Sequence, residues 1–407
     1  MITDLSAPLR IALLTHSVNP RGGVVHTLEL AEALQAAGHE VTVIAPAAQG
    51  QRFFRPVSCR TELARVASLP TDVVTMAETR IAAAAAHLSA LLAREQFDVF
   101  HAQDSLSGNA LATLRQRGLI GGYLRTVHHL DHFLDPRLAA WQLRGFTHAD
   151  EVLCVSQLWC DALRRDHNIH AALVHNGVNL SRYSPTPQAT DAAVAQRHGL
   201  RPGAPLVLAV GGIEERKNTL RLLQAFAQLR QQQPAAQLVI AGGASLLNHD
   251  AYVRAFDDAV AAHGMTTQGE GKAVVITGAV DDAAMPALYR LADVLAIPSL
   301  SEGFGLAVLE ALACGTPAVA AEIAPFTEHL TDADVCWADP FDTASIAAAL
   351  ARATRRAAFD VPAVCRRFSW SASARRHAQL YRLYQHQQHQ QHQHQQLNVT
   401  RAAPCLR

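Results

Sequence analysis

Lysine is almost absent from this chain: of its 35 basic residues only two, Lys217 and Lys272, are lysines, and the rest are arginines. Codon composition is the simplest cause of such a bias, so a lysine that persists against it draws attention. Paired cysteines are also lacking. The seven cysteines are scattered, and no CxxC pair or Cys/His group has zinc-finger spacing. This usage predicts a reduced, cytoplasmic protein.

Neither sign of charge is in excess, since the 35 basic residues are balanced by 35 acidic ones. This balance argues against nucleic acid as a partner. Hydrophobic residues make up 49% and charged residues 17%, which excludes a disordered protein. No apolar run reaches the ~18 residues of a membrane span, and Met1–Arg10 lacks the apolar stretch of a signal peptide. The length of 407 residues predicts two to three domains.

Short strand-like runs alternate with helical stretches along the first half of the chain. Arg10–Thr15 is an apolar run of strand length, and Val24–Ala37 carries apolar residues at helical spacing before Gly38 ends the helix. Glu40–Ala45 is the next strand-like run. This order is the repeating unit of a parallel sheet, and further strands are predicted at 98–101, 123–127, 151–155 and 173–175.

The second half repeats this pattern after a proline-rich stretch. Strands are predicted at 206–210, 237–241, 273–277, 294–298 and 318–320, with helices at 218–231, 285–292 and 305–313. We therefore expect two doubly wound α/β domains, with ligands at the carboxyl ends of the strands in the cleft between them. The predicted division is an N-terminal domain at 1–180, a linker at 181–205, a C-terminal domain at 206–365, a helix at 366–384 and a tail at 385–407.

The tail begins with the run QHQQHQQHQHQQ at residues 385–396. Its low complexity predicts disorder, and metal binding by the histidines is the alternative. We therefore leave the tail out of the predicted fold.

Two glycine-containing loops are candidate phosphate sites because each lies between a strand and a helix N-terminus. The first contains Gly22 and Gly23, which let backbone N–H groups approach an anion. The second, residues 211–218, includes Arg216 and Lys217. Cations at a helix N-terminus oppose the helix dipole unless an anion is bound there. This favours a pyrophosphate site over a solvated helix start.

The segment SLSEGFGLAVLE, residues 299–310, connects a predicted strand to a predicted helix. Free backbone N–H groups of Phe304, Gly305 and Leu306 could hold a phosphate. Glu302 and Glu310 are eight positions apart, so their carboxylates are expected to be about 8–12 Å apart. That is more than the ~5–5.5 Å of a retaining glycosidase pair. They are predicted to make two separate contacts with one elongated ligand.

Together these motifs resemble those of the retaining family-four glycosyltransferases, the group 1 glycosyl transferases of GT-B fold. The resemblance covers roughly residues 10–385 and rests on the Gly22-Gly23 loop, the turn at 212–218 and the Glu302-x7-Glu310 segment. It implies two Rossmann-like domains facing across a cleft, with a C-terminal helix returning toward the N-terminal domain. The implied activity is transfer of a hexose from a nucleoside-diphosphate sugar, without metal or cofactor, to a glycan, a lipid-linked acceptor or a small molecule.

The resemblance also implies roles for individual residues. Glu302 would contact the donor sugar, Glu310 the ribose, and Lys217 the pyrophosphate. His128, after an N-terminal strand, would lie near the reacting sugar, with His129 as the alternative. The C-terminal domain at 206–365 would bind the nucleotide sugar and the N-terminal domain the acceptor. The other donor contacts are expected from Gly22, Gly23, Gly278, Val280, Phe304, Gly305 and Leu306.

One position departs from the family pattern. Many members have an arginine five residues before the lysine, where this chain has Gly212, and Arg216 is the candidate substitute. The expected mechanism is front-face attack with retention. In it the cations stabilise the charge of the leaving group, and a departing phosphate oxygen helps to deprotonate the acceptor.

Several other functions are alternatives. An NAD-dependent oxidoreductase should have GxGxxG after a strand, and neither half does. A phosphorylase needs a Schiff-base lysine, for which Lys217 and Lys272 are the candidates. A sugar-nucleotide epimerase is compatible with the fold. A non-catalytic nucleotide-sugar-binding subunit is disfavoured because both Glu302 and Lys217 are present.

The sequence gives the least information about the acceptor and about contact with a membrane. Loops 101–107 and 130–136 carry no recognisable motif, and the second has several histidines and aspartates in or just before it, which predict a polar acceptor pocket rather than a metal site. The run QRFFR at 51–55 and an Ala/Leu-rich helix at 81–94 would suit peripheral membrane contact. Such features are more often an ordinary loop and a packed helix, which is the favoured interpretation.

Overall fold

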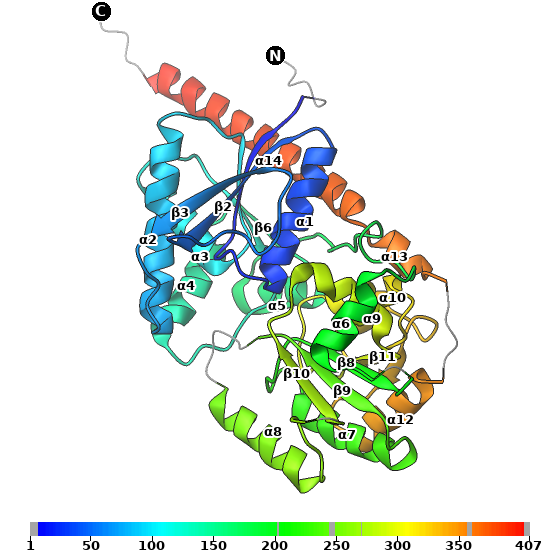
Figure 1. The fold of residues 1–407 in the computed structure, drawn as a ribbon. Helices are drawn as coiled ribbons and strands as arrows, with labels where there is room; N and C mark the ends of the chain where they lie inside the picture. The colour runs from blue at the N-terminus through cyan, green and yellow to red at the C-terminus, as the bar shows by residue number, and fades with distance from the viewer. Residues whose placement is uncertain (1–6, 202, 244–248, 270, 356–359, 403–407) are drawn as a thin grey trace, which may run out of the picture. The chain divides into compact units, whose positions relative to one another are not determined.

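In the computed structural model the described residues are 7–201, 203–243, 249–269, 271–355 and 360–402, with side chains described as far as residue 390. The ends of the predicted N-terminal domain and tail, residues 1–6 and 403–407, and Pro202 of the predicted linker therefore lie outside the description. The chain divides into two compact units (Figure 1). Unit 1 comprises residues 1–154, 163–174 and 370–407, and unit 2 comprises residues 155–162 and 175–369.

Unit 1 is built on a parallel sheet with the strand order β3-β2-β1-β4-β5-β6-β7. Aspartate side chains begin three of its helices: Asp72, Asp104 and Asp135 each accept a hydrogen bond from a backbone N–H in the first turn. The strands are β1 Arg10–Leu14, β2 Glu40–Ala48, β3 Arg60–Val66, β4 Val99–Ala102, β5 Leu124–Val127, β6 Glu151–Cys154 and β7 Ala172–Leu173. The helices are α1 Gly22–Ala36, α2 Val73–Leu92, α3 Ser105–Gln116, α4 Pro136–Thr147 and α14 Trp370–Ala402, while α5 Gln157–His167 is divided between the units.

Unit 2 has a second parallel sheet with the order β10-β9-β8-β11-β12-β13. Its strands are continuous apolar runs, as expected where helices cover both faces. The strands are β8 Leu206–Val210, β9 Gln237–Ala241, β10 Val274–Gly278, β11 Val294–Ile297, β12 Ala318–Ala321 and β13 Cys336–Ala338. The helices are α6 Thr190–His198, α7 Thr219–Gln232, α8 Asp250–Ala262, the 3-10 turn η1 Asp282–Ala284, α9 Met285–Leu291, α10 Leu306–Ala313, α11 Phe326–His329, α12 Thr343–Ala353 and α13 Ala363–Arg367.

Both sheets have the strand order of a Rossmann fold, so the predicted two-domain α/β class is confirmed. The order reverses between β1 and β4 in unit 1 and between β8 and β11 in unit 2. Loops that follow these strands lie side by side at the carboxyl edge of each sheet. The topology thus brings together the loops after β8 and β11, which contain Lys217 and Glu302, although 85 positions separate these residues.

Two strands were not predicted. Strand β3 pairs in parallel with β2 from Arg60 to Val66 at an edge of the sheet. It contains two arginines and a glutamate, so it lacks the apolar run of a central strand. Strand β13 has three residues, Cys336–Ala338, and also lies at an edge. Strand β3 was missed because an edge strand tolerates charged residues, and β13 because three residues are too short to give a strand pattern.

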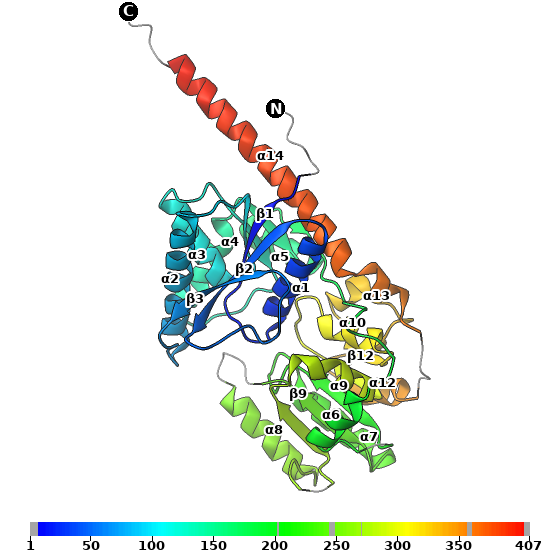
Figure 2. The same ribbon diagram turned by 45° about the horizontal axis from the view of Figure 1, so that its top comes forward.

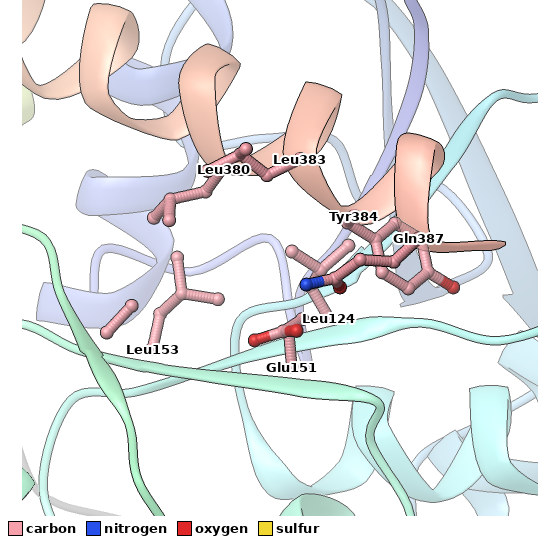
Figure 3. A pocket seen from close by; sticks show the side chains of 8 residues that line it. Leu124, Glu151, Leu153, Leu380, Leu383, Tyr384 and Gln387 are labelled. Carbon is pink, nitrogen blue, oxygen red and sulfur yellow. The ribbon is translucent and has the colours of Figure 1, made fainter. Parts of the chain in front are cut away.

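The last helix, α14, belongs to unit 1 and packs on α1 and the sheet, as the predicted return of the C-terminal helix requires (Figure 2). Its Tyr381 hydroxyl lies 2.7 Å from His101 Nδ1, and Tyr384 donates a hydrogen bond of 3.2 Å to Asp150. Figure 3 shows side chains of α14 facing β5 and β6 around a cavity of about 90 Å³. The helix continues to Ala402, through part of the segment for which the composition predicted disorder.

No helix in the described ranges combines the length and the hydropathy needed to cross a membrane. The Ala/Leu-rich segment at 81–94 contains the second half of α2 and the two residues after it, and its buried side chains pack inside unit 1. The segment predicted as a linker, 181–205, contains helix α6, which packs on α9 and ends at Gly199 with φ of +65°.

Candidate active site

The loops after β8 and β11 are joined by backbone and side-chain hydrogen bonds. The N–H of Leu300 donates to the carbonyl of Arg216 at 2.8 Å, and Asn218 donates to the carbonyls of Pro298 and Pro340 at 2.9 and 2.6 Å. Asn218 has a φ of +58°, which asparagine tolerates better than most residues. The Arg-Lys-Asn turn is therefore fixed against the Ser-Glu-Gly loop.

Glu302 is the centre of the charges in this region. Its carboxylate lies 2.7 Å from Lys217 Nζ, 2.7 Å from Ser299 Oγ and 3.5 Å from Arg216 Nη1. Burial alone would raise the pKa of Glu302, but the charges of Lys217 and Arg216 and the hydrogen bonds from Lys217 and Ser299 lower it to about 2. Glu302 is therefore ionised across the physiological range and can accept hydrogen bonds from hydroxyl groups.

Gly212, the position of the missing family arginine, has a left-handed backbone with φ of +82°. A Cβ atom there would lie 2.8 Å from the carbonyl oxygen of Gly243. A side chain is thus excluded by both the dihedral angle and the space. The guanidinium of Arg216 lies beside Glu302 instead, so the turn still brings a second cation to this carboxylate.

The Gly-Phe-Gly segment is supported from behind by aromatic rings. Phe304 is 3% exposed and stacks on His329 with ring centroids 4.5 Å apart. Burial, with a smaller effect of His175 and Arg367, lowers the pKa of His329 to about 4, so this ring is neutral. Gly305 has a φ of +95°, and a Cβ atom there would collide with the ring of Phe326. As the N-cap of α10, Gly305 has no side chain to cover the first amides of the helix.

The other predicted donor residues of unit 2 lie on neighbouring elements. Glu310, in α10, accepts a hydrogen bond of 2.7 Å from the buried Tyr289 hydroxyl. Gly278 ends β10 with φ of +66°, and its carbonyl accepts a 3.0 Å hydrogen bond from Gly242. Val280 is partly buried against the unit 2 core. Within the described ranges none of these residues forms a hydrogen bond or ion pair with Glu302.

In unit 1 the first glycine loop and the predicted histidine lie together. Helix α1 begins at Gly22, and its N-cap, Arg21, makes no side-chain capping bond. A Cβ atom on Gly23 would lie 3.7 Å from His128 Cδ2, so the loop backbone closely approaches this ring. Burial and the neighbouring charges of His26 and Arg125 keep the pKa of His128 well below its usual value. His128 is therefore a neutral imidazole.

His128 is held by ring packing rather than by hydrogen bonds. Its Nε2 is buried without a hydrogen-bond partner in the described part of the chain. The ring of His26 meets it edge to face at 4.5 Å, and Trp370 of α14 packs on His26 at 5.3 Å. His129, the alternative candidate, lies in the exposed loop, 3.1 Å from Asp131. This geometry favours His128 over His129.

Several residues of these sites were not singled out by the sequence. Ser299 is buried and bonds Glu302, and His329 supports Phe304. His26 lies on the buried face of α1, and its place in the helical pattern of that face was the one signal in the sequence that could have identified it. Arg80, in α2, and Arg125, in β5, are buried and carry no motif. Among the described residues there is no group of three His, Cys, Asp or Glu side chains arranged to hold a metal ion.

Comparisons with known proteins decide the family. Residues 191–359 match the model of "Glycosyl transferases group 1", and residues 20–182 match that of "Glycosyltransferase Family 4". D-inositol 3-phosphate glycosyltransferase of Mycolicibacterium smegmatis is 30% identical in an alignment 360 residues long that covers 79% of this chain and 78% of the relative. The chain belongs to the group 1 glycosyltransferases.

Other relatives of this glycosyltransferase are consistent with that family. A GDP-mannose-dependent alpha-(1-6)-phosphatidylinositol dimannoside mannosyltransferase of Mycobacterium tuberculosis is 27% identical over 81% of this chain and 84% of the relative. Sucrose-phosphate synthase from Thermosynechococcus elongatus has the same fold, with a TM-score of 0.74, 24% identity and coverage of 92% of this chain and 98% of that chain. Anabaena HepE, solved in complex with UDP and glucose, gives a TM-score of 0.70 at 17% identity, covering 91% of this chain and 99% of HepE. These likenesses confirm the GT-B fold.

Proposed function

We propose that this glycosyltransferase moves a hexose from a nucleoside-diphosphate sugar to a hydroxyl of a polyol acceptor, with retention of the anomeric configuration and without a metal ion. The observation that carries the proposal is the cluster of Glu302, Lys217 and Arg216 beside the uncapped N-terminus of α10. An anionic diphosphate fits two cations and free helix amides. An ionised carboxylate fits the hydroxyls of a sugar.

The donor half of the reaction is assigned to unit 2. When the bond between the anomeric carbon and the phosphate oxygen breaks, negative charge develops on the leaving nucleoside diphosphate. Lys217 and Arg216 stabilise that charge in the place of a divalent ion. Glu302 fixes the sugar, and Glu310 is assigned to the ribose because it lies farther along α10. Phe304, Gly305 and Leu306 supply backbone amides, while Gly278 and Val280 are assigned to the base.

The acceptor half is assigned to unit 1. The acceptor oxygen forms a bond to the anomeric carbon, and its proton passes to the departing phosphate oxygen. His128 is neutral, and its ring lies against Gly23 at the start of α1, so it can contact the reacting groups without adding a positive charge. Gly22 and Gly23 keep their predicted role of approaching the diphosphate through backbone N–H groups.

Two relatives and one structural neighbour narrow the substrates to be tested. One is named for GDP-mannose and phosphatidylinositol dimannoside, another for D-inositol 3-phosphate, and HepE was solved with UDP and glucose. We therefore place UDP- and GDP-hexoses first among the donors, and inositol-type polyols, free or in a lipid headgroup, first among the acceptors. A lipid acceptor would bring the cytoplasmic protein to a membrane surface.

The testing experiment is a thermal-shift screen with UDP, GDP, ADP and their sugar conjugates, with and without EDTA, followed by transfer assays with the donor found. Binding to the native state raises the melting temperature by mass action. We expect a shift with one nucleotide that EDTA does not change and that Lys217→Ala abolishes. NMR of the product is expected to show the anomeric configuration of the donor. Inverted product, or a need for a divalent ion, would contradict the proposal, as would the absence of any nucleotide shift.

His128→Ala provides the matched test of the acceptor half. The substitution removes the imidazole but no donor contact of unit 2. We expect kcat to fall by roughly 10²-fold or more, with the nucleotide-induced shift retained. His129→Ala is the control, since His129 lies in an exposed loop beside Asp131, and its activity should remain within about twofold of wild type. The reverse pattern would assign the role to His129.

A further inference from the structure

Two arginines in unit 1 are buried and have no ion-pair partner among the residues that the structure describes. Arg80, in α2, is 3% exposed, and Arg125, in β5, is 6% exposed. The Nε and Nη1 atoms of both guanidinium groups are buried, and within the described ranges they have no hydrogen-bond partner. Neither arginine forms an ion pair with a described carboxylate. Buried polar groups are normally satisfied, and unpaired buried charges are costly, so both positions need an explanation.

Asp104 is the acid near both arginines, and its carboxylate is already engaged. It accepts hydrogen bonds of 2.8 and 2.9 Å from the backbone N–H and hydroxyl of Ser107, and it lies 3.4 Å from His16 Nδ1. Burial lowers the pKa of Arg80; the charge of Asp104 opposes this effect, and that of Arg21 adds to it. Burial also lowers the pKa of Arg125 to about 10, again against Asp104. One aspartate thus faces two buried guanidinium groups, with Arg21 close to one of them.

This excess of positive charge lies where the fold places ligands. Arg21 immediately precedes the glycines that begin α1, and Asp104 follows β4, so both belong to loops at the switch point of the unit 1 sheet. Arg125 is the second residue of β5, three positions before His128, and its charge is one of those that lower the pKa of His128. Thr15 Oγ1 and Gln103 Oε1, at the ends of β1 and β4, are further buried atoms without a partner in the described chain.

The chemistry of the missing partner follows from the guanidinium group. Arginine presents donors in a planar fork that matches a phosphate, and burial strengthens the interaction. A purely structural arginine would be paired with an acid or replaced by an apolar residue of the same volume. On the basis of the function proposed above, we propose that the acceptor carries a phosphate group and that Arg80 binds it, with Arg125 adding to the positive potential between that phosphate and His128. The phosphate can belong to a soluble polyol monoester or to a lipid headgroup.

The first test separates a ligand-binding role from a structural one. In Arg80→Met a side chain of similar length replaces the unpaired charge, so the ligand-free protein should melt at the same temperature or roughly 2–4 °C higher. Inorganic phosphate is then added while the donor site is saturated with the nucleoside diphosphate identified in the donor screen. We expect phosphate to raise the melting temperature of wild type and of Arg80→Lys, but not of Arg80→Met. A lower melting temperature of ligand-free Arg80→Met, or equal phosphate shifts in all variants, would overturn the proposal.

The second test uses transfer assays with three acceptors: myo-inositol, myo-inositol 3-phosphate in solution, and vesicles containing phosphatidylinositol. We expect wild type to prefer a phosphorylated acceptor. Which of the two phosphorylated acceptors it prefers shows whether the phosphate belongs to a soluble polyol or to a lipid headgroup. In Arg80→Met the KM for that acceptor should rise by at least about 30-fold. Arg117→Gln is the control, because Arg117 is an exposed arginine at the end of α3 whose side chain has no hydrogen-bond or ion-pair partner in the described part of the chain. It should behave as wild type.

The two proposals fail in different ways. If no nucleotide binds and no donor is consumed, the proposed function fails. If the donor binds and sugar is transferred, but myo-inositol serves as well as its phosphate and Arg80→Met has the KM of wild type, the glycosyltransferase stands and the phosphate site is wrong. An equal rise in the KM of Arg80→Met for all three acceptors would also overturn the phosphate-site proposal, because the effect would not depend on phosphate.

Discussion

At the switch point of unit 2, the carboxylate of Glu302 lies 2.7 Å from Lys217 and 3.5 Å from Arg216. At that of unit 1, Asp104 is engaged by Ser107 and His16, while Arg80 and Arg125 have no described acid within ion-pair distance. The two sheets have the same strand order, but the buried charges at their switch points are paired in unit 2 and not in the described part of unit 1. Unit 2 satisfies its charges internally and is preorganised. Unit 1 keeps an unmatched positive charge, which a ligand can neutralise.

Of the substitutions considered, Lys217→Met should have the largest effect on the charge balance of unit 2. It leaves Glu302 buried beside a single, more distant cation. We expect a loss of about 3–5 kcal/mol in the free energy of unfolding, as for other broken buried pairs. Activity should fall by roughly 10³-fold, since the main diphosphate charge is lost. Urea unfolding and kcat/KM measure the two effects. The double variant Lys217→Met/Glu302→Gln should recover most of the stability and none of the activity; recovery of both would refute the assigned roles.

Gly305→Ala tests the preorganisation of unit 2 through its backbone. The positive φ of +95° and the ring of Phe326 leave no room for a methyl group. We expect a loss of about 2 kcal/mol in stability and a weaker affinity for the nucleotide by roughly 10-fold or more, since the first amides of α10 must move. Calorimetric titration with the nucleotide measures the affinity. Gly264→Ala, at a φ of +64° with open space around it, is the control for backbone strain alone.

Acid should weaken both units through buried histidines. Burial lowers the pKa of His329 in unit 2 and of His377 in unit 1 to about 4 each, from an ordinary 6.5. The unfolded chain takes up these protons below pH 6.5 and the native state does not until about pH 4, so the free energy of unfolding falls as the pH drops through this window. The loss at pH 5 should be about 2 kcal/mol for each histidine. Urea unfolding at pH 7 and 5 measures it.

Histidine-to-glutamine variants assign this pH dependence to a unit. His377→Gln should reduce the pH dependence of the free energy of unfolding of unit 1, and His329→Gln should reduce that of unit 2. A pH slope that neither variant changes would mean that other groups dominate. Single-tryptophan variants that keep Trp370 in unit 1 or Trp337 in unit 2 can follow the two units separately.

The smallest expected effect is that of His26→Gln, which removes the ring packed edge to face on His128. Edge-to-face contacts contribute about 1 kcal/mol, so we expect kcat to fall by about 5-fold while the KM for the donor stays constant. His26 acts here as a positioning residue. A change in KM without a change in kcat would assign it a binding role instead.

The predictable parts of this protein are those in which a single segment carries the signal. Strands β8 and β9 have the predicted limits, Leu206–Val210 and Gln237–Ala241, because buried parallel strands are unbroken apolar runs. The turn at Lys217 and the Glu302 loop were likewise recognised from local patterns. Their mutual contact follows from the strand order, which alternation of strands and helices makes the simplest choice.

The parts that could not be predicted depend on contacts between distant segments. Arg80 lies within an Ala-rich helix, and nothing next to it in the sequence shows that its guanidinium lacks an acid. The rings behind His128 come from α1 and from Trp370, almost 250 positions later. Edge strand β3 was missed because its exposed side accepts charged residues. Burial and pairing of this kind are properties of the folded chain and not of its local pattern.

The position of α14 has a consequence for synthesis. The helix supplies Trp370, His377 and Tyr381 to the interior of unit 1, yet it is made after all of unit 2. At ordinary translation rates, roughly 10–40 s separate the emergence of residue 175 from that of residue 370. During this interval unit 2 can fold on the ribosome, while unit 1 still lacks α14 and His26 and His101 are not covered. We therefore expect the first half of the nascent chain to need protection by chaperones for longer than the second, although it leaves the exit tunnel first.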